Sequence, residues 1–355
     1  MGLPFASGFS PPVTAAAWGT IASIAATLLL LLYTIELRVH RRFHERRRAR
    51  VTAFWRAVIA EAMTDGVKLG AAPPLPPRQR AEVLRLWNYT RSMIEGAAAD
   101  RLVALADQLG LRQVARNQAE HGRSSARLTA IQTLGHLRDG ESFAALLAAT
   151  GDANTLVAIT AAEALTEIDP ARAVAALIPR LAERRDWPRT HVFRMLEKAG
   201  SALVSEPLYR CIRAASDDDA AYLLQYAVIA EFDVRDAIAT ELTASRRDPD
   251  LLAAALKVAS GFEGVPRLDE LLRHPAWYVR MQAAALLGRM GRTEDAVRLE
   301  KLLGDEEWWV RYRAAKALIH LPSMTGPRLE EIRTRLRDPY ARDVLQQAMA
   351  EAGLR

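Results

Sequence analysis

Few side chains in this sequence could hold a metal ion or act as a catalytic group, and they are scattered. Three consecutive acids, Asp217, Asp218 and Asp219, supply the carboxylate oxygens that divalent cations prefer. Three neighbouring residues cannot all face one ion, however, and acids just before a helix ordinarily accept hydrogen bonds from its free amides. We therefore expect this run to cap a helix and predict no metal site there.

The histidines and the single cysteine give no better candidate. The histidines of the large domain lie in distant segments without the short spacing of metal ligands: His121, His136, His191, His274 and His320. Cys211 stands alone, which excludes an intramolecular disulfide and a multi-cysteine metal site, and we expect it to be a small buried hydrophobe. The sequence also lacks a phosphate-binding glycine loop and a G-x-S-x-G nucleophile motif. We therefore expect no catalytic residue, no cofactor and no metal, and predict that the chain is not an enzyme.

The densest charge is the block RVHRRFHERRRAR at residues 38–50. Its seven arginines are Arg38, Arg41, Arg42, Arg46, Arg47, Arg48 and Arg50. Seven arginines less Glu45 give +6, which equals the formal net charge of the whole chain. The large domain is therefore nearly neutral, which argues against a nucleic-acid surface on it.

Upstream of this block, residues 1–35 carry no charged side chain. A helix over residues 13–37 would be long enough for a hydrocarbon core of about 30 Å, so the sequence predicts a transmembrane helix there. The positive-inside rule then places residues 1–12 outside and the rest in the cytoplasm, with the arginines setting the topology of a single-pass inner-membrane protein. Binding of anionic lipid or nucleic acid through residues 38–50 is the alternative.

Residues 38–69 combine this basic juxtamembrane segment with an amphipathic helix. Its apolar residues Val51, Phe54, Trp55 and Ile59 recur at helical spacing. We expect this face to pack on the first helices of the soluble domain rather than to lie on a membrane surface. Four prolines in GAAPPLPP then predict a linker at residues 70–78.

The remaining residues, 79–355, show helical spacing of apolar residues with a breaker every dozen or so positions. A period of about 31 residues is clearest between WYVRMQAAALLGRMG and WVRYRAAKALIHLP, and this length is typical of paired helices in repeat proteins. One large apolar position recurs with a single shortened step, between the fourth and fifth members: Leu134, Leu165, Leu196, Ala227, Leu256, Leu287, Leu318 and Met349. Such hairpins bury their apolar faces only against their neighbours, so the register predicts an all-α protein, an α-solenoid of about eight helical hairpins.

The segments GDEEWWVRYRAAKALIHL and RHPAWYVRMQAAALLGRM resemble the turn and second helix of HEAT-like repeats, in particular the short form also found in phycobilisome lyases. The resemblance covers residues 97–355 and is weakest at 200–260. It implies a structural ladder in which an acid of the turn pairs with the arginine of the next helix, and Asp305 and Arg311 fit this pattern. The repeat itself carries no chemistry, so a phycobilisome-lyase-like or other HEAT-repeat enzyme stays the alternative.

The surface lined by the second helices is where such a solenoid is expected to bind a partner. The candidate partner contacts on this surface and in its turns are Arg194, Lys198, Arg289, Arg313, Lys316, Trp277 and Trp308. The predicted function is a membrane-anchored, non-catalytic scaffold or regulatory subunit that binds a protein partner, for example a membrane glycosyltransferase, at the cytoplasmic face of a bacterial membrane. Membrane lipid is a second expected contact, and neither nucleic acid nor a small-molecule substrate is expected.

Overall fold

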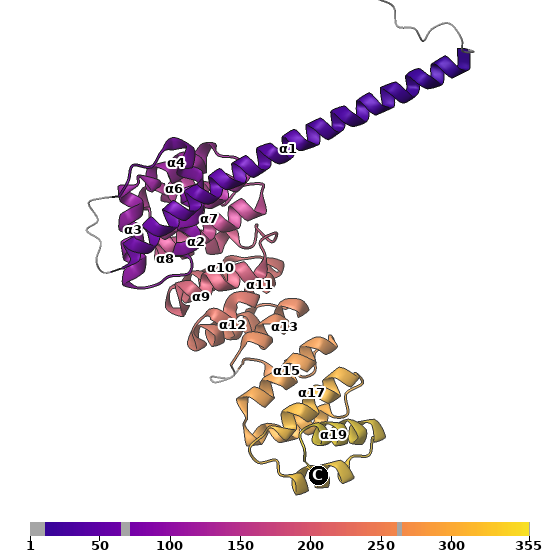
Figure 1. Cartoon of the computed structure of the whole chain (residues 1–355). Coiled ribbons are helices and arrows are strands. Elements are labelled where there is room, and N and C mark those ends of the chain that lie inside the picture. Colours follow the sequence, from indigo (N-terminus) through magenta and orange to yellow (C-terminus); the bar gives the residue numbers. More distant parts are fainter. Residues whose placement is uncertain (1–10, 65–71, 261–264, 355) are drawn as a thin grey trace, which may run out of the picture. The chain divides into compact units, whose positions relative to one another are not determined.

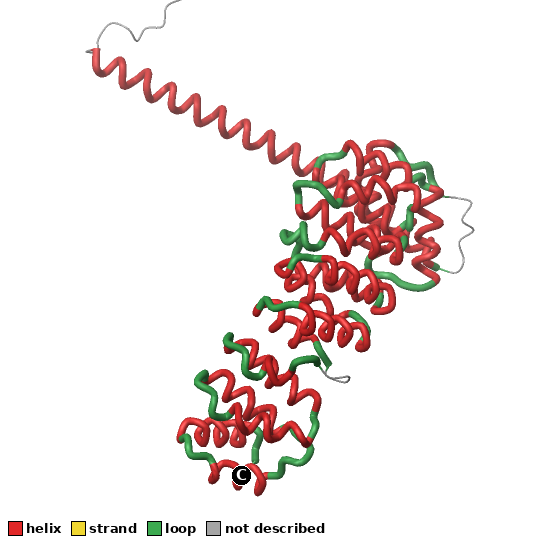
Figure 2. The backbone as a smooth tube through the Cα atoms, turned by 180° about the vertical axis from the view of Figure 1, so that it is seen from behind, coloured by secondary structure: helices red, strands yellow, loops and turns green. Residues whose placement is uncertain are grey.

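The computed structural model describes residues 11–64, 72–260 and 265–354. Within the first helix, the side chains of some residues lie outside this description: 11–17, 19, 21, 37 and 39–48. The described residues form helices joined by loops, with no strand among them (Figure 2). This confirms the predicted all-α class. Contacts along the chain separate two compact units, Met1–His121 and Gly122–Arg355.

The first unit is built on a long helix and the short helices beside it. Its described elements are α1 (Pro11–Met63), the 3-10 turn η1 (Pro77–Gln79), α2 (Arg80–Arg91), α3 (Ala97–Gln108) and α4 (Leu111–His121). Its core includes Trp87, whose buried indole N–H donates a hydrogen bond of 2.8 Å to the carbonyl oxygen of Leu102. This bond satisfies the one polar group of a large buried side chain.

The C-terminal end of α1 packs on these short helices. Trp55, Ile59 and Ala62 are buried, and the indole N–H of Trp55 donates to Oε1 of Gln79 at 2.7 Å. Phe54 stays exposed. The apolar face predicted for residues 51–63 therefore serves as packing surface within this unit. Of the predicted linker, residues 72–76 have no regular structure, and residues 70–71 lie outside the described residues.

The predicted transmembrane helix at residues 13–37 and the single-pass inner-membrane location are wrong. Among the described residues, no helix combines the length and the apolar character that a bilayer crossing requires. In the arginine block, Arg38 and Arg50 are exposed, and the other five side chains lie outside the description. Most of residues 1–12, predicted to lie outside the cell, also falls outside the described residues.

The second unit is a succession of helical hairpins (Figure 1). The first helices of the hairpins are α6 (Phe143–Ala149), α8 (Pro170–Leu177), α10 (Ser201–Ala214), α12 (Phe232–Ser245), α14 (Leu268–Leu271), α16 (Ala296–Leu302) and α18 (Gly326–Arg335). The second helices are α5 (Ser124–His136), α7 (Thr155–Ile168), α9 (Arg189–Ala199), α11 (Asp217–Leu223) with η4 (Leu224–Ile229), α13 (Pro249–Val258), α15 (Trp277–Met290), α17 (Trp308–Ile319) and α19 (Pro339–Glu351). Short 3-10 turns lie between them: η2 (Gly140–Ser142), η3 (Ile178–Arg180) and η5 (Thr293–Asp295).

The core of this unit follows the predicted repeat register. All of the large apolar positions that define it, from Leu134 to Met349, are buried. Consecutive second helices pack side by side from α5 to α9 and from α13 to α19. The repeat is irregular at the shortened interval between Ala227 and Leu256. There Ala227 lies in the 3-10 helix η4 rather than in an α-helix. The predicted repeat register is thus confirmed by burial.

Glycine and alanine allow two pairs of second helices to approach closely. A Cβ atom at Gly135 of α5 would lie 2.9 Å from Cα of Ala164 on α7. A Cβ atom at Gly288 of α15 would lie 3.0 Å from Cα of Ala317 on α17. Each glycine follows a register leucine and each alanine precedes one, so the same contact recurs in two distant repeats.

Candidate functional site

Glu167 of α7 joins three second helices through one carboxylate. Its Oε2 lies 2.9 Å from Nδ1 of His136 on α5, and its Oε1 accepts a hydrogen bond of 2.6 Å from Nζ of Lys198 on α9. The three residues occupy the same position of consecutive repeats. Lys198, a candidate partner contact, is therefore engaged with an acid of the preceding repeat.

The charge of Glu167 is stabilised by these neighbours. Burial of the carboxyl opposes its ionisation, but the hydrogen bonds with His136 and Lys198 outweigh burial and lower the pKa of Glu167 to about 2. The carboxylate is therefore ionised at neutral pH, where it offsets the ammonium charge of Lys198.

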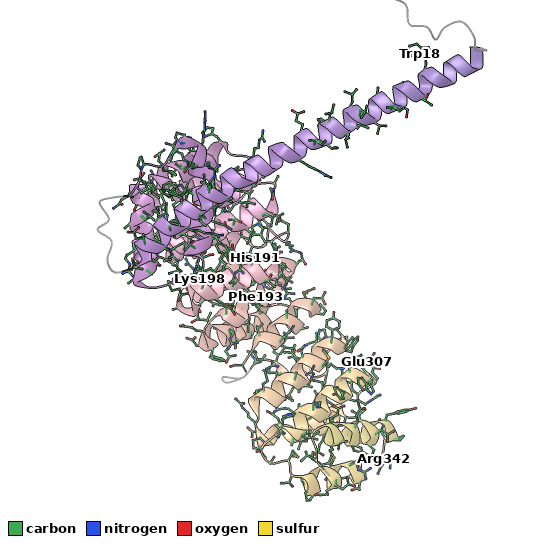
Figure 3. All side chains as sticks on the ribbon, in the orientation of Figure 1. Trp18, His191, Phe193, Lys198, Glu307 and Arg342 are labelled. Atoms are coloured by element: carbon green, nitrogen blue, oxygen red, sulfur yellow. The ribbon has the colours of Figure 1, made fainter. Side chains whose placement is uncertain are left out.

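A second carboxylate on the same face of α7 repeats this arrangement. Oε1 of Glu163 lies 2.8 Å from Nδ1 of His191 and accepts a hydrogen bond of 2.6 Å from Nη2 of Arg194. His191 and Lys198 of α9 are labelled in Figure 3. Each basic candidate of α9 thus faces an acid of α7. The negative charges of α7 and the positive charges of α9 therefore offset one another between the two helices.

Arg289 of α15 contacts the C-terminal end of α13. Its Nη2 donates to the carbonyl oxygen of Leu256 at 2.6 Å and its Nε to that of Ala259 at 3.2 Å. Burial lowers the pKa of Arg289, and the positive charge of Arg313 adds to this effect. The side chain therefore satisfies carbonyl groups that the end of α13 leaves free.

The two basic candidates of α17 differ in their surroundings. Nζ of Lys316 lies 3.2 Å from Oε2 of Glu351 on α19, which also accepts a hydrogen bond of 2.7 Å from the hydroxyl of Tyr312. Arg313 is exposed, and no ion pair to it is found among the described residues. Of the five basic candidates, Arg313 is the one whose charge is not engaged by a described acid or carbonyl group.

The tryptophans of the turns lie at the N-terminal ends of second helices. Trp308 is partly exposed and stacks on Tyr312 with ring centroids 5.0 Å apart, and Trp309 meets it edge-on at 4.7 Å. Trp277 is half-buried against the core and meets Tyr278 edge-on. Trp309 was not among the predicted contacts, although its side chain is 54% exposed.

The predicted ladder of acids and arginines exists but runs in the other direction. Asp305 forms a bidentate pair with Arg280 of the preceding second helix, with both N···O distances 2.8 Å. Arg127 and Asp152 repeat this contact at 2.9 Å. Arg311, the predicted partner of Asp305, donates instead to its backbone carbonyl oxygen at 2.7 Å. The predicted Asp305–Arg311 ion pair is therefore wrong, because the turn carboxylate faces the helix before it.

The acidic run before α11 has structural partners. Ser216 accepts the backbone N–H of Asp219 at 3.2 Å, Asp217 pairs with Arg246 at 2.6 Å, and Asp218 and Asp219 both pair with Arg185 at 2.7 Å. Within the described part of the chain, no group of three or more histidine, cysteine or acidic side chains could hold a metal ion.

The sequence analysis did not predict the hydrogen-bond and ion-pair partners of the acidic residues. The signal was present for Glu163 with Arg194 and for Glu167 with Lys198, because opposite charges stand one repeat apart in the sequence. No comparable signal announces Asp236, a buried acid that accepts the backbone N–H of Ser260 at 2.6 Å in the irregular part of the stack.

A comparison with protein families agrees with this architecture. The family model for HEAT repeats matches residues 110–197, 221–319 and 264–352. No curated protein matches the sequence. Among solved structures, the chain is similar to an engineered protein whose crystal structure came from a structural genomics consortium, with 16% identity, a TM-score of 0.33, and coverage of 83% of this chain and 78% of that one.

Proposed function

This chain belongs to the HEAT-repeat family, and we propose that it acts as a non-catalytic scaffold or regulatory subunit that binds a protein partner. HEAT repeats commonly present an extended surface built from successive second helices. The proposal places the main contact on the C-terminal repeats, from α15 to α19. The α7–α9 face contributes less, since Glu163 and Glu167 already neutralise the basic side chains there.

Exposed aromatic side chains carry this proposal. Trp309 and Tyr340 lie in the first turns of α17 and α19 at equivalent positions of adjacent repeats, and their side chains are 54% and 67% exposed. Aromatic side chains with a polar handle supply much of the binding energy at protein interfaces. Two of them on adjacent repeats form a surface that an extended partner segment can cover.

The test is capture of a partner by the full chain in its native cell. Tagged wild-type protein is cross-linked and purified beside the variants Trp309→Ala and Leu156→Ala. Leu156 is a matched control, because it occupies the position of Trp309 in the repeat of α7 and is 58% exposed. We expect a defined protein to co-purify with the wild type and the Leu156 variant and to be depleted with the Trp309 variant. Absence of any such protein from the wild-type sample would contradict the proposal.

A further inference from the structure

Two arginines at equivalent positions of neighbouring repeats are anchored in the same way. Nη1 of Arg280 donates to the carbonyl oxygens of His274 and Pro275 at 2.8 and 3.0 Å. Nη1 of Arg311 donates to those of Asp305 and Glu306 at 2.7 and 3.2 Å. Each guanidinium is thereby held against the turn that precedes its own helix.

The other edge of the guanidinium, formed by Nε and Nη2, binds a carboxylate in Arg280 but not in Arg311. Nε and Nη2 of Arg280 hold the carboxylate of Asp305, which lies 25 residues further along the chain. The corresponding position for Arg311 is Leu336, which has no carboxylate. Nε of Arg311 is buried without a hydrogen-bond partner, and no described acid forms an ion pair with this side chain.

Asp338 shows how the next turn differs. Its Oδ1 accepts the backbone N–H of Tyr340 at 3.0 Å, as Oδ1 of Asp305 accepts that of Glu307. Asp338 therefore accepts a similar hydrogen bond but occupies the register position of Glu307, whereas the register position of Asp305 is occupied by Leu336. Where Asp305 meets Arg280, the ring of Tyr340 instead faces Arg311, with its centroid 5.8 Å from Cζ.

We propose that the free edge of Arg311, between α17 and α19, binds a carboxylate of a protein partner. This inference rests on the proposed function and names the chemistry of the partner: an acidic side chain flanked by apolar residues. Arginine binds carboxylates bidentately through this edge, and Arg280 shows the same geometry one repeat earlier. A partner carboxylate would satisfy a buried donor that the free chain leaves unpaired.

The surroundings of this carboxylate slot, defined by Arg311, Trp309 and Tyr340, fit such a segment. The exposed rings of Trp309 and Tyr340, in the first turns of α17 and α19, supply apolar contact, and α19 also carries the exposed and positively charged Arg342. Among the described residues no acid pairs with Arg342. Because Tyr340 stands over the guanidinium and is itself exposed, rotation of its ring is the movement that admits the carboxylate.

The test measures binding of two fluorescein-labelled heptapeptides to the full chain by fluorescence anisotropy. One peptide alternates glutamate with phenylalanine, and the other has glutamine in place of each glutamate. The protein variants are Arg311→Lys, which keeps the charge but loses the bidentate guanidinium, and Arg328→Lys, the same change at an exposed arginine of α18 that pairs with Glu331. Thermal unfolding is measured to verify that both variants are folded.

We expect the acidic peptide to bind the wild type about tenfold more tightly than the glutamine peptide. Arg311→Lys should weaken binding of the acidic peptide by about tenfold, and Arg328→Lys should change this binding by less than about twofold. Equal losses in both variants, or no loss in Arg311→Lys, would overturn the proposal. A variant Asp338→Asn that binds about tenfold more tightly than the wild type would also overturn it, because Asp338 would then fill the slot in the free protein.

The partner capture described above separates the two proposals. A partner that co-purifies equally with the wild type and with Arg311→Lys leaves the scaffold function standing and overturns the slot. Peptide binding that depends on Arg311, with no partner captured by the wild type, supports the slot and contradicts the scaffold function.

Discussion

The guanidinium of Arg280 and the carboxylate of Asp305 form a bidentate ion pair between two successive repeats. Both N···O distances are 2.8 Å, and the two side chains are only 9% and 8% exposed. Hydrogen bonds from Arg280 to two carbonyl oxygens complete the contact. A charge buried this deeply is costly when its partner is removed, so the pair holds α15 against the turn before α17.

We expect Asp305→Asn to lower the free energy of unfolding by about 3 kcal/mol, because Arg280 would keep its buried charge with only the exposed carboxylate of Glu306, 3.3 Å away, as an acid partner. Asparagine keeps the side-chain oxygen that accepts the N–H of Glu307, so the turn itself is preserved. Urea unfolding followed by circular dichroism measures the change. Glu330→Gln is the control, since its pair with Arg333 is exposed and within one helix, and it should cost less than about 0.5 kcal/mol. Equal costs for the two variants would contradict this assignment.

The second prediction concerns pH and Glu167. Its folded-state pKa of about 2 lies below its ordinary value of 4.5. The stabilisation is therefore fully present above about pH 4.5 and is lost as the pH falls toward 2, with an upper limit of about 3 kcal/mol. We expect Glu167→Gln to be less stable than the wild type at pH 7. The gap should narrow between pH 4.5 and pH 2 in urea titrations, and a gap that is constant over this range would show that the carboxylate charge is not responsible.

The third prediction concerns the close approach of α15 and α17. Alanine at Gly288 should lower the free energy of unfolding by about 1–3 kcal/mol, even though alanine favours helix formation, because its Cβ would lie 2.8 Å from Cβ of Ala317. The double variant with Ala317→Gly should recover part of the loss. Gly140→Ala is the control, since its Cβ would meet no atom within 4 Å. A stabilising effect of Gly288→Ala would rule out this packing.

The buried side of the repeats can be predicted from the sequence because one packing requirement recurs at a fixed interval. Leu287 and Leu318 occupy the same position of adjacent repeats and are both fully buried. The shortened step between Ala227 and Leu256 likewise signals an irregularity, which the structure shows as the 3-10 helix η4. Burial depends on the position within one repeat, so a single sequence reveals it.

The polar surface is harder to predict because a charged residue does not reveal which neighbour neutralises it. Glu167 and Lys198 stand one repeat apart and meet across two helices at 2.6 Å, but Arg280 and Asp305 stand 25 residues apart, so the repeat spacing does not indicate their pair. Arg311 follows Asp305 closely in sequence and contacts its backbone, but the carboxylate of Asp305 turns toward Arg280. The ion-pair partner of each side chain depends on the direction in which its turn faces, and this direction is set by the stacking of the repeats.

Arg289 supplies the last prediction, because its predicted role and its observed contacts differ. The sequence places it among the partner contacts, whereas the structure shows its guanidinium bound to the carbonyl oxygens of Leu256 and Ala259. We expect Arg289→Met to lower the free energy of unfolding by about 2 kcal/mol, because these carbonyl groups lose a charged donor at the end of α13. Hydrogen exchange should quicken first in residues 252–260. Arg313→Met, an exposed arginine on the next second helix, should change stability by less than about 0.5 kcal/mol. If Arg289→Met leaves stability and exchange unchanged but reduces partner capture, the side chain is a binding residue and its hydrogen bonds to α13 are dispensable.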